Sequence, residues 1–241
     1  MKNEEIWKVS KVVKNKKGHW THSLNPDEVA ISSRLMVNII AQLYETHIPQ
    51  HVKGDLLDLG CGKVPFYGMY KPYAKNIYCI DWENSLHGNI YLDQTCDLNK
   101  SVNFPDKSLD TIILSDVLEH IEKPQLLFAE MKRVLRNNGK IILNVPFLYG
   151  VHEAPYDYFR YTEFALSKLA AEHNFSVIKM IPFGNAVMVI IDIISKIISH
   201  KPILGKFTAK TLQSITILLK SKVYKHTAFP LGYFLILQKT K

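Results

Sequence analysis

The spacing of apolar residues changes along the chain and predicts different elements in different segments. Between residues 54 and 145, short apolar runs are separated by more polar segments. In one of these segments, 124–135, the apolar residues recur every three or four positions. That segment is typical of an amphipathic helix, which Asn137-Asn138-Gly139 ends. Buried strands are predicted over 56–59, 77–81, 109–115 and 140–145. Strands that alternate with helices indicate parallel βαβ units with right-handed crossovers, and therefore an α/β fold.

The segments on either side of this region show other patterns. Residues 1–25 are polar and basic, and we expect a loosely packed arm. Asn25-Pro26-Asp27-Glu28 indicates a helix start, because Asn25 or Asp27 can cap a helix whose first turn is acidic. Residues 186–198 are almost entirely aliphatic, with the polar positions Asp192, Ser195, Lys196 and Ser199 on one helical face.

These patterns divide the chain into four parts. We predict an N-terminal arm (1–25), an α/β core (26–184), a basic aliphatic helical insertion or lid (185–228) and a final strand that completes the core (229–241). The insertion holds a second predicted amphipathic helix over 207–223. A helix that spans a membrane needs about 20 apolar residues. Because 186–198 is shorter and interrupted by charge, we predict no transmembrane helix.

Composition and charge narrow the class of protein. With 47% hydrophobic and 22% charged residues, the chain is not intrinsically disordered. The formal charge of +8 is concentrated in residues 173–241, which hold ten lysines and one acid, Asp192, and so carry +9. This asymmetry favours a polyanionic partner or an anionic surface, and a solvated lysine face is the equally weighted alternative.

The N-terminal residues and the three cysteines indicate where the protein is located and whether it binds zinc. The N-terminus lacks the apolar core of a secretion signal. Cys61, Cys79 and Cys96 are scattered without the spacing of zinc ligands, which indicates reduced thiols in a cytoplasmic protein. No other cluster in the sequence suggests a catalytic metal, so none is predicted.

A glycine turn after the first core strand is the most informative feature. Asp58-Leu59-Gly60-Cys61-Gly62 places two glycines where the backbone can approach a ligand closely. The next strand ends about 20 residues later in Asp81, where an acid binds ribose hydroxyls in doubly wound folds. The dinucleotide pattern Gly-x-Gly-x-x-Gly fails, because Pro65 occupies the third glycine position. A nucleoside ligand without a pyrophosphate is therefore favoured.

Five segments in order resemble the motifs of class I S-adenosylmethionine (SAM)-dependent methyltransferases, and within that class the chain is similar to the type-11 group. They are 58–62, 96–98, 104–110, 115–121 and 133–140. The resemblance covers roughly residues 54–182 and implies a Rossmann-like sheet, mostly parallel with an antiparallel last strand. It implies SAM as cofactor and S-adenosylhomocysteine as product, and says nothing about the acceptor. One departure is Lys63-Val64-Pro65, where relatives usually carry a small residue and glycine.

The resemblance also predicts the cofactor-binding residues. Asp58 would accept from the SAM amino group or orient the glycine turn, Asp81 would bind the ribose, and Asp97 would accept from the adenine amine. Glu119 and His120 have an alternative role as a helix cap or a surface pair. The full predicted set is Asp58, Gly60, Cys61, Gly62, Asp81, Trp82, Asp97, Leu98, Ser115, Asp116 and His120.

The segment 146–162 is a candidate active-site loop, because it follows the fifth core strand and is dense in aromatic and charged residues. A hydroxyl acceptor must lose a proton during methyl transfer, and His152 is the first candidate base. Asp157 would orient that base or receive the proton, and Arg160 would bind an anionic group or lock the loop. The alternative is that Asp157 and Arg160 form a salt bridge that holds the loop.

Three functional hypotheses follow. The leading one is methyl transfer from SAM to a small-molecule, glycan or lipid-linked acceptor, with oxygen as the methylated atom. The second is an RNA or tRNA methyltransferase that uses the basic C-terminal region; because that region is aliphatic as well as basic, nucleic acid is the less favoured partner. The third is a SAM-binding scaffold or regulator without turnover. For 186–223 we predict contact with the inner membrane face or a homodimer interface, with equal weight.

Overall fold

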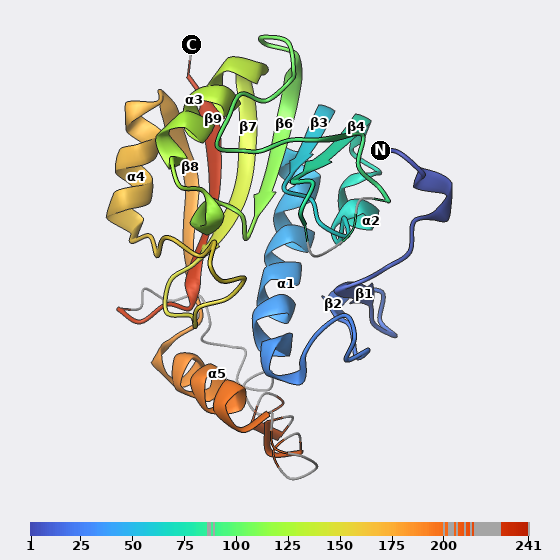
Figure 1. Cartoon of the computed structure of the whole chain (residues 1–241), viewed down its shortest axis with the longest axis vertical. Coiled ribbons are helices and arrows are strands. Elements are labelled where there is room, and N and C mark those ends of the chain that lie inside the picture. The colour runs from blue at the N-terminus through green and yellow to red at the C-terminus, as the bar shows by residue number, and fades with distance from the viewer. Residues whose placement is uncertain are drawn as a thin grey trace.

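The central element of the fold is a mixed seven-stranded sheet (Figure 1). The computed structural model describes residues 1–85, 88, 90–199, 201, 205, 207–209, 211–212, 214 and 228–240. The strand order is β5-β4-β3-β6-β7-β9-β8, and β9 alone runs antiparallel to its neighbours. The predicted α/β sheet with an antiparallel last strand is therefore confirmed. The strands are β3 (Gly54–Leu59), β4 (Ala74–Asp81), β5 (Gln94–Thr95), β6 (Leu109–Ser115), β7 (Leu135–Pro146), β8 (Phe175–Phe183) and β9 (Gly232–Lys239).

Helices cover both faces of this sheet, as Figure 1 shows. The alternation of side chains along each strand explains the two layers. Leu56 packs with residues of α1 (Arg34–His51) and α2 (Tyr67–Tyr70), whereas its neighbour Leu57 packs with residues of α3 (Pro124–Val134) and α4 (Glu163–Glu172). The strands are buried on both sides, which is why they appear as continuous apolar runs in the sequence.

Two strands of the sheet, β5 and β8, were not predicted, and both lie at its edges. β8 lies at the edge, next to β9 only, and most of its side chains between Phe175 and Phe183 are exposed or half-buried. The apolar residues of β8 are interrupted by Lys179 and Pro182, so this edge strand lacks the continuous apolar run that identified the central strands.

The N-terminal segment is packed against the core, contrary to the expectation of a loose arm. It contains η1 (Glu4–Ile6), the hairpin of β1 (Val12–Lys14) and β2 (Trp20–His22), and η2 (Ile31–Ser33). The side chains of Val12 and Trp20 are buried in the cluster that α1 joins. Hydrogen bonds add to the attachment: the Thr21 hydroxyl donates to Asn38 Oδ1 at 2.7 Å, and the Trp20 N–H donates to Glu45 at 3.2 Å.

The predicted helix start at residues 25–28 was also wrong, because α1 begins at Arg34. The Asn25 side chain accepts a hydrogen bond from the Asp27 N–H at 3.1 Å, and its carbonyl accepts from the Val29 N–H at 3.0 Å. These bonds close a turn, after which Ala30 is extended. Cap-forming residues also favour turns, and this segment uses them in that way.

Helix α5 (Ala186–Ser199) confirms the predicted helix over 186–198, but its faces are reversed relative to an ordinary surface helix. Its polar face is buried: Asp192 is 1% exposed and forms an ion pair with Lys196, while Ser195 is 0% exposed. The exposed face is aliphatic and comprises Val187, Ile190, Ile193, Ile194 and Ile197. In the described part of the chain, no helix combines the length and apolar content that crossing a membrane requires. The second predicted helix, 207–223, lies largely outside the described residues.

Candidate functional site

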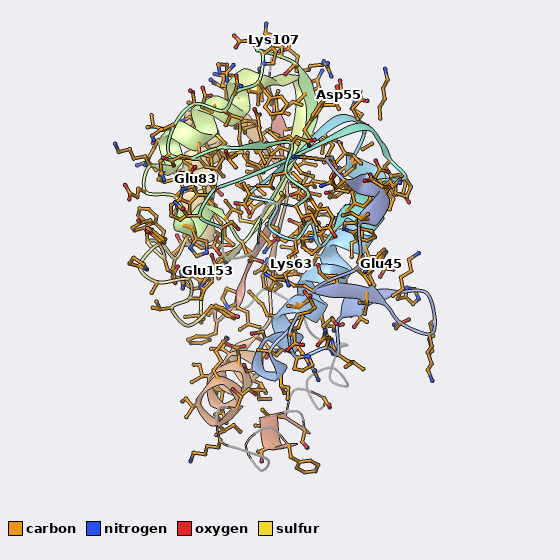
Figure 2. The ribbon with its side chains drawn as sticks, turned by 45° about the vertical axis from the view of Figure 1, so that its right-hand side comes forward. Glu45, Asp55, Lys63, Glu83, Lys107 and Glu153 are labelled. Carbon is orange, nitrogen blue, oxygen red and sulfur yellow. The ribbon has the colours of Figure 1, made fainter. Side chains whose placement is uncertain are left out.

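A cavity of about 750 Å³ lies at the carboxyl ends of the central strands, within the size range of small-ligand pockets. In Figure 2, Lys63 and Glu153 lie at this end of the sheet, and Asp55 and Lys107 lie at the opposite end. Every residue predicted to bind the cofactor lines this cavity. They are Asp58, Gly60, Cys61, Gly62, Asp81, Trp82, Asp97, Leu98, Ser115, Asp116 and His120.

The glycine turn needs its glycines for both conformation and space. Gly60 and Gly62 have φ values of +73° and +52°, a region that side chains disfavour. A Cβ on Gly60 would lie 2.5 Å from a methyl carbon of Val117. The Gly60 N–H donates to the Ile80 carbonyl at 2.9 Å, which anchors the turn to the end of β4.

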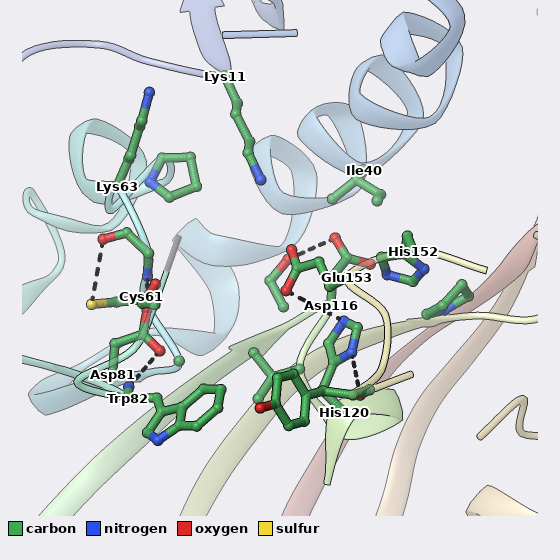
Figure 3. A pocket seen from close by; sticks show the side chains of 18 of the residues that line it. Lys11, Ile40, Cys61, Lys63, Asp81, Trp82, Asp116, His120, His152 and Glu153 are labelled. Carbon is green, nitrogen blue, oxygen red and sulfur yellow. Dashed lines mark hydrogen bonds and ion pairs between the residues drawn. The ribbon is translucent and has the colours of Figure 1, made fainter. Parts of the chain in front are cut away.

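Two carboxylates of the cavity are held by main-chain donors close to them. Asp81 accepts from the Gly62 N–H at 2.9 Å and the Trp82 N–H at 2.7 Å (Figure 3). Asp97 accepts from the Asn99 N–H at 3.0 Å. This hydrogen bond, with help from Lys100 at 3.2 Å, lowers the pKa of Asp97 below its usual value. Both groups are therefore fixed acceptors that face the cavity.

Asp58 is buried beneath the turn and has a different environment. The Tyr70 hydroxyl donates to it at 2.7 Å. Burial raises the pKa of Asp58 to about 7, despite the opposing effect of this hydrogen bond. A cationic group that reached Asp58 would favour its ionised form.

The unusual Lys63-Val64-Pro65 segment does not close the cavity. Pro65 forms part of the wall, and Val64 has a positive φ of +52°. The Lys63 ammonium lies 3.0 Å from Glu28, so it links the glycine turn to the N-terminal segment.

A buried amide connects Ser115 and Asp116, and the sequence analysis did not identify it as part of the site. Asn144 is 0% exposed; its amide nitrogen donates to Asp116 at 2.6 Å, and its oxygen accepts from the hydroxyls of Ser115 at 2.7 Å and Tyr44 at 3.0 Å. Burial raises the pKa of Asp116 to about 7. The available signal was one polar residue inside the apolar run of β7.

The candidate active-site loop docks on η3 (Leu118–His120) through its main chain. The N–H groups of Tyr158 and Phe159 donate to the Glu119 carbonyl at 2.9 and 3.2 Å. The His120 Nδ1 atom lies 2.8 Å from the Tyr156 carbonyl oxygen. These contacts place His152 beside His120 at the cavity wall, with ring centroids 4.8 Å apart (Figure 3).

Asp157 and Arg160 hold this loop together and do not line the cavity. Arg160 donates to both Asp157 oxygens at 2.5 and 2.6 Å, and also to the Gly150 carbonyl at 3.1 Å. Burial acts to raise the pKa of Asp157, but hydrogen bonds from Arg160 and the His152 N–H lower it to about 2. Arg160 thus forms the salt bridge that the sequence analysis gave as the alternative, and its contact with a substrate anion stays a prediction. Asp157 contacts His152, whose Nδ1 atom lies 3.3 Å away.

Glu119 is the least expected residue of the site. Its side chain is 0% exposed, and neither carboxylate oxygen accepts a hydrogen bond from any described residue, so it caps no helix. The Nε2 atoms of His152 and His120 lie 3.6 and 3.8 Å from Glu119 Oε1. Burial raises the pKa of Glu119 to about 7. Nothing in the sequence shows that His152 meets this acid, because the two lie on separate segments.

Comparisons with known proteins agree with this fold and site. Residues 57–143 match the family model described as a methyltransferase domain. An uncharacterised protein of Methanocaldococcus jannaschii is 32% identical over 92 residues, which are 37% of this chain and 40% of that protein. The chain thus spans less than half the length of this curated relative.

Solved structures show the same fold at low identity. The [4+2]-cyclase SpnF has a TM-score of 0.58 at 16% identity, with 85% of this chain and 83% of that chain covered. A SAM-dependent methyltransferase from Mesorhizobium loti has a TM-score of 0.55 at 13% identity, with 82% and 97% covered. The resemblance to class I SAM-dependent methyltransferases is therefore confirmed. Residues 57–143 thus match a methyltransferase domain, and the fold is that of SAM-dependent methyltransferases.

Proposed function

We propose that this protein transfers the methyl group of SAM to a hydroxyl group of a small-molecule, glycan or lipid-linked acceptor. One observation carries the proposal: the predicted cofactor residues and His152 line the same cavity. A shared fold does not fix the chemistry, since SpnF is a cyclase. The proposal therefore depends on the residues of the site.

The arrangement supports a specific orientation of the cofactor. Asp81, held by two main-chain donors, accepts from the ribose hydroxyls, and Asp97 with Leu98 contacts the adenine. Asp58 accepts from the SAM amino group, and Ser115 and Asp116 line the methionine part. The sulfonium methyl then faces the wall that His120 and His152 form.

The proposed reaction is an in-line displacement. The acceptor oxygen forms a bond to the methyl carbon while the carbon–sulfur bond breaks, and sulfur keeps the electron pair to give S-adenosylhomocysteine. The hydroxyl proton passes to Nε2 of His152, and Asp157 on the Nδ1 side orients the ring. Arg160 positions Asp157 and thereby the loop.

The remaining wall of the cavity supports an acceptor with apolar surface. Its apolar side chains come from the segment before α1 and from α1 itself, and they are Val29, Met36, Val37 and Ile40. Lys11 lines the same cavity and supplies a positive charge. This lining suits a small or lipid-linked molecule better than a polynucleotide. Six of the ten lysines of the basic C-terminal region that an RNA acceptor would use lie outside the described residues.

We propose a cytoplasmic location, the domain division at 25, 184 and 228, and contact of 186–223 with the inner membrane face or a second copy. The exposed aliphatic face of α5 is compatible with both contacts.

Label transfer tests the proposal. The protein is incubated with SAM carrying a labelled methyl group and with separate small-molecule, lipid and RNA fractions of a cell extract. Label in the small-molecule or lipid fraction, with equimolar S-adenosylhomocysteine, is expected. Label in RNA would favour the second hypothesis, and SAM binding without turnover in any fraction would favour a regulator. The His152→Asn variant should bind SAM and transfer little label.

A further inference from the structure

Beyond methyl transfer itself, the structure assigns a binding site for a divalent transition-metal cation to Glu119, His120 and His152. The three side chains form a two-histidine, one-carboxylate set whose ligand atoms all lie within 4.8 Å of one another. The sequence analysis predicts no metal, because Glu119 and His120 on η3 meet His152 only in the folded chain.

The distances between the ligand atoms of these three side chains fit a single metal ion bound by all of them. Zinc bonds to imidazole and carboxylate of about 2.0–2.2 Å separate tetrahedral ligand atoms by roughly 3.3–3.6 Å. The Nε2 atoms of His152 and His120 lie 3.6 and 3.8 Å from Glu119 Oε1. These separations are too long for hydrogen bonds and close to those of a metal's ligand shell. Small side-chain rotations would complete the coordination.

The outer nitrogen of each imidazole already faces an acceptor. His120 Nδ1 lies 2.8 Å from the Tyr156 carbonyl oxygen, and His152 Nδ1 lies 3.3 Å from an Asp157 carboxylate oxygen. Metal-binding histidines almost always have such an acceptor on the other nitrogen, which fixes the tautomer and the ring orientation. With the proton on each Nδ1, the two Nε2 atoms, which lie nearest Glu119 Oε1, would be free to bind a cation.

The buried carboxylate of Glu119 is a second, independent observation that points to a cation ligand. A buried carboxylate normally accepts several hydrogen bonds or pairs with a positive charge. Among the described residues, none donates a hydrogen bond to either oxygen of Glu119, and the nearest polar atoms include the two imidazole nitrogens. A divalent cation between these groups would satisfy all three.

The site is built on rigid main chain and opens to the cavity. The Tyr158 and Phe159 N–H groups bind the Glu119 carbonyl, which fixes the loop to η3 at this point. His120 and His152 line the cavity, so a fourth position on the cation would face the acceptor. Two imidazoles in three ligands favour Zn²⁺ or a similar ion over Mg²⁺.

The role of this cation rests on the proposed function. A bound Zn²⁺ lowers the pKa of an oxygen ligand, so an acceptor hydroxyl at the open position would lose its proton to solvent. In the zinc-loaded chain, the cation would hold the Nε2 lone pair of His152 and activate the acceptor. In the zinc-free chain, Nε2 of His152 stays the base of the proposed function.

Zinc titration of the untagged, chelator-treated chain against a competing chelating dye tests the site. One Zn²⁺ per chain is expected. Glu119→Gln and His152→Asn should each weaken zinc binding by at least about 100-fold, and Asp157→Asn by about 10- to 100-fold. His19→Asn is the matched control, because it removes an exposed imidazole remote from the site, and it should leave zinc binding unchanged.

Zinc-edge X-ray absorption of the wild-type chain gives a result that does not depend on folded variants. Two imidazoles and one carboxylate are expected. The metal site would be overturned if the chain bound no zinc, or if the wild type and Glu119→Gln bound it equally. Preference for Mg²⁺ or a ligand shell without imidazole would also overturn it. SAM titration of the same samples separates the two proposals: zinc bound without SAM binding would overturn methyl transfer alone, and SAM binding without zinc would overturn the metal site alone.

Discussion

Two regions of the cavity differ in how their ionisable groups are held. Around the glycine turn, Asp81 and Asp97 accept hydrogen bonds from main-chain N–H groups close to them in the sequence. Around η3, the ionisable groups come from separate segments of the chain, and Glu119 has no hydrogen-bond donor among the described residues. We call the first region, lined by Asp58, Gly60, Gly62, Asp81 and Asp97, the cofactor half of the cavity. The second, formed by η3 and the loop 147–162, is the acceptor half. The first is complete without a ligand, and the second depends on a salt bridge and a cluster of three side chains.

This difference suggests a division of labour. Under the proposed function, the cofactor half binds one invariant molecule, which suits fixed acceptors with fixed geometry. An acceptor half assembled by a loop can change its substrate without disturbing the cofactor. Variants should therefore separate SAM affinity from turnover, and the following predictions test that separation.

The largest expected effect is the loss of turnover in His152→Asn. A positioned base contributes roughly 10²- to 10⁴-fold to a rate, so kcat should fall by about that factor. SAM affinity should change by less than about threefold, because the ring lies in the acceptor half. Steady-state kinetics and calorimetry measure the two quantities, and His173→Asn is the control, because His173 contacts Phe128 and does not line the cavity. A parallel loss of SAM affinity would remove the distinction between the halves.

The next effect concerns stability of the cofactor half. Gly60→Ala places a Cβ 2.5 Å from Val117 at a φ of +73°. Strain and overpacking together should lower the free energy of unfolding by about 2–5 kcal/mol. Gly18→Ala is the matched control, because Gly18 has a φ of +81° with nothing within 4 Å. Urea unfolding should show a clearly smaller loss for Gly18→Ala, and Val117→Ala should partly rescue Gly60→Ala. Equal losses would mean that close packing at Gly60 is unimportant.

A smaller effect is expected from the salt bridge of the acceptor half. Arg160→Ala removes hydrogen bonds to a buried carboxylate, and bonds of this charged kind contribute about 1.5–3 kcal/mol. Hydrogen exchange of the Tyr158 and Phe159 amides should accelerate while that of the central strands stays the same. Calorimetry should show unchanged SAM affinity. Unchanged exchange at these two amides would contradict the role of Arg160 in holding the loop.

The smallest effect is the pH dependence that Asp58 gives to SAM affinity. Burial raises its folded-state pKa to about 7 from an ordinary value of 3.8. Under the proposed function its ionised form accepts from the SAM ammonium, so SAM affinity should rise with pH and level off above about 7, with a slope of at most about tenfold per pH unit.

The same group makes an opposite contribution to the stability of the free protein. Because the folded state holds the proton more tightly than the unfolded state, Asp58 contributes stability below about pH 4 that is lost as the pH rises to about 7. In Asp58→Asn both dependences should be reduced, as calorimetry and urea unfolding between pH 5 and 8 would show. If SAM affinity and the free energy of unfolding of Asp58→Asn depended on pH as they do in the wild type, another group would be responsible for both dependences.

The sequence predicted the central sheet and the residues that line the cavity around the glycine turn, because both are encoded locally. Continuous apolar runs identified β3, β4, β6 and β7, and the turn from Asp58 to Gly62 is closed by bonds to the end of β4. The edge strand β8 and the packed hairpin of β1 and β2 were missed, since their burial depends on neighbours far away in the chain.

The acceptor half could be predicted only in part for the same reason. His152 was identified from the composition of its loop, but its approach to Glu119 results from main-chain hydrogen bonds between η3 and Tyr158. The polar face of α5 was visible in the sequence, but its burial against the protein was not. A pattern shows which residues share a face, and tertiary contacts decide which face is covered.

Calorimetric titration of SAM into the wild-type chain and into Asp81→Asn tests the central claim most directly. One SAM per wild-type chain is expected. Binding to Asp81→Asn should be at least about tenfold weaker, because the substitution removes charge-assisted hydrogen bonds to the ribose. No binding at millimolar SAM, or equal affinity in both proteins, would contradict the account of a cofactor half built around this carboxylate.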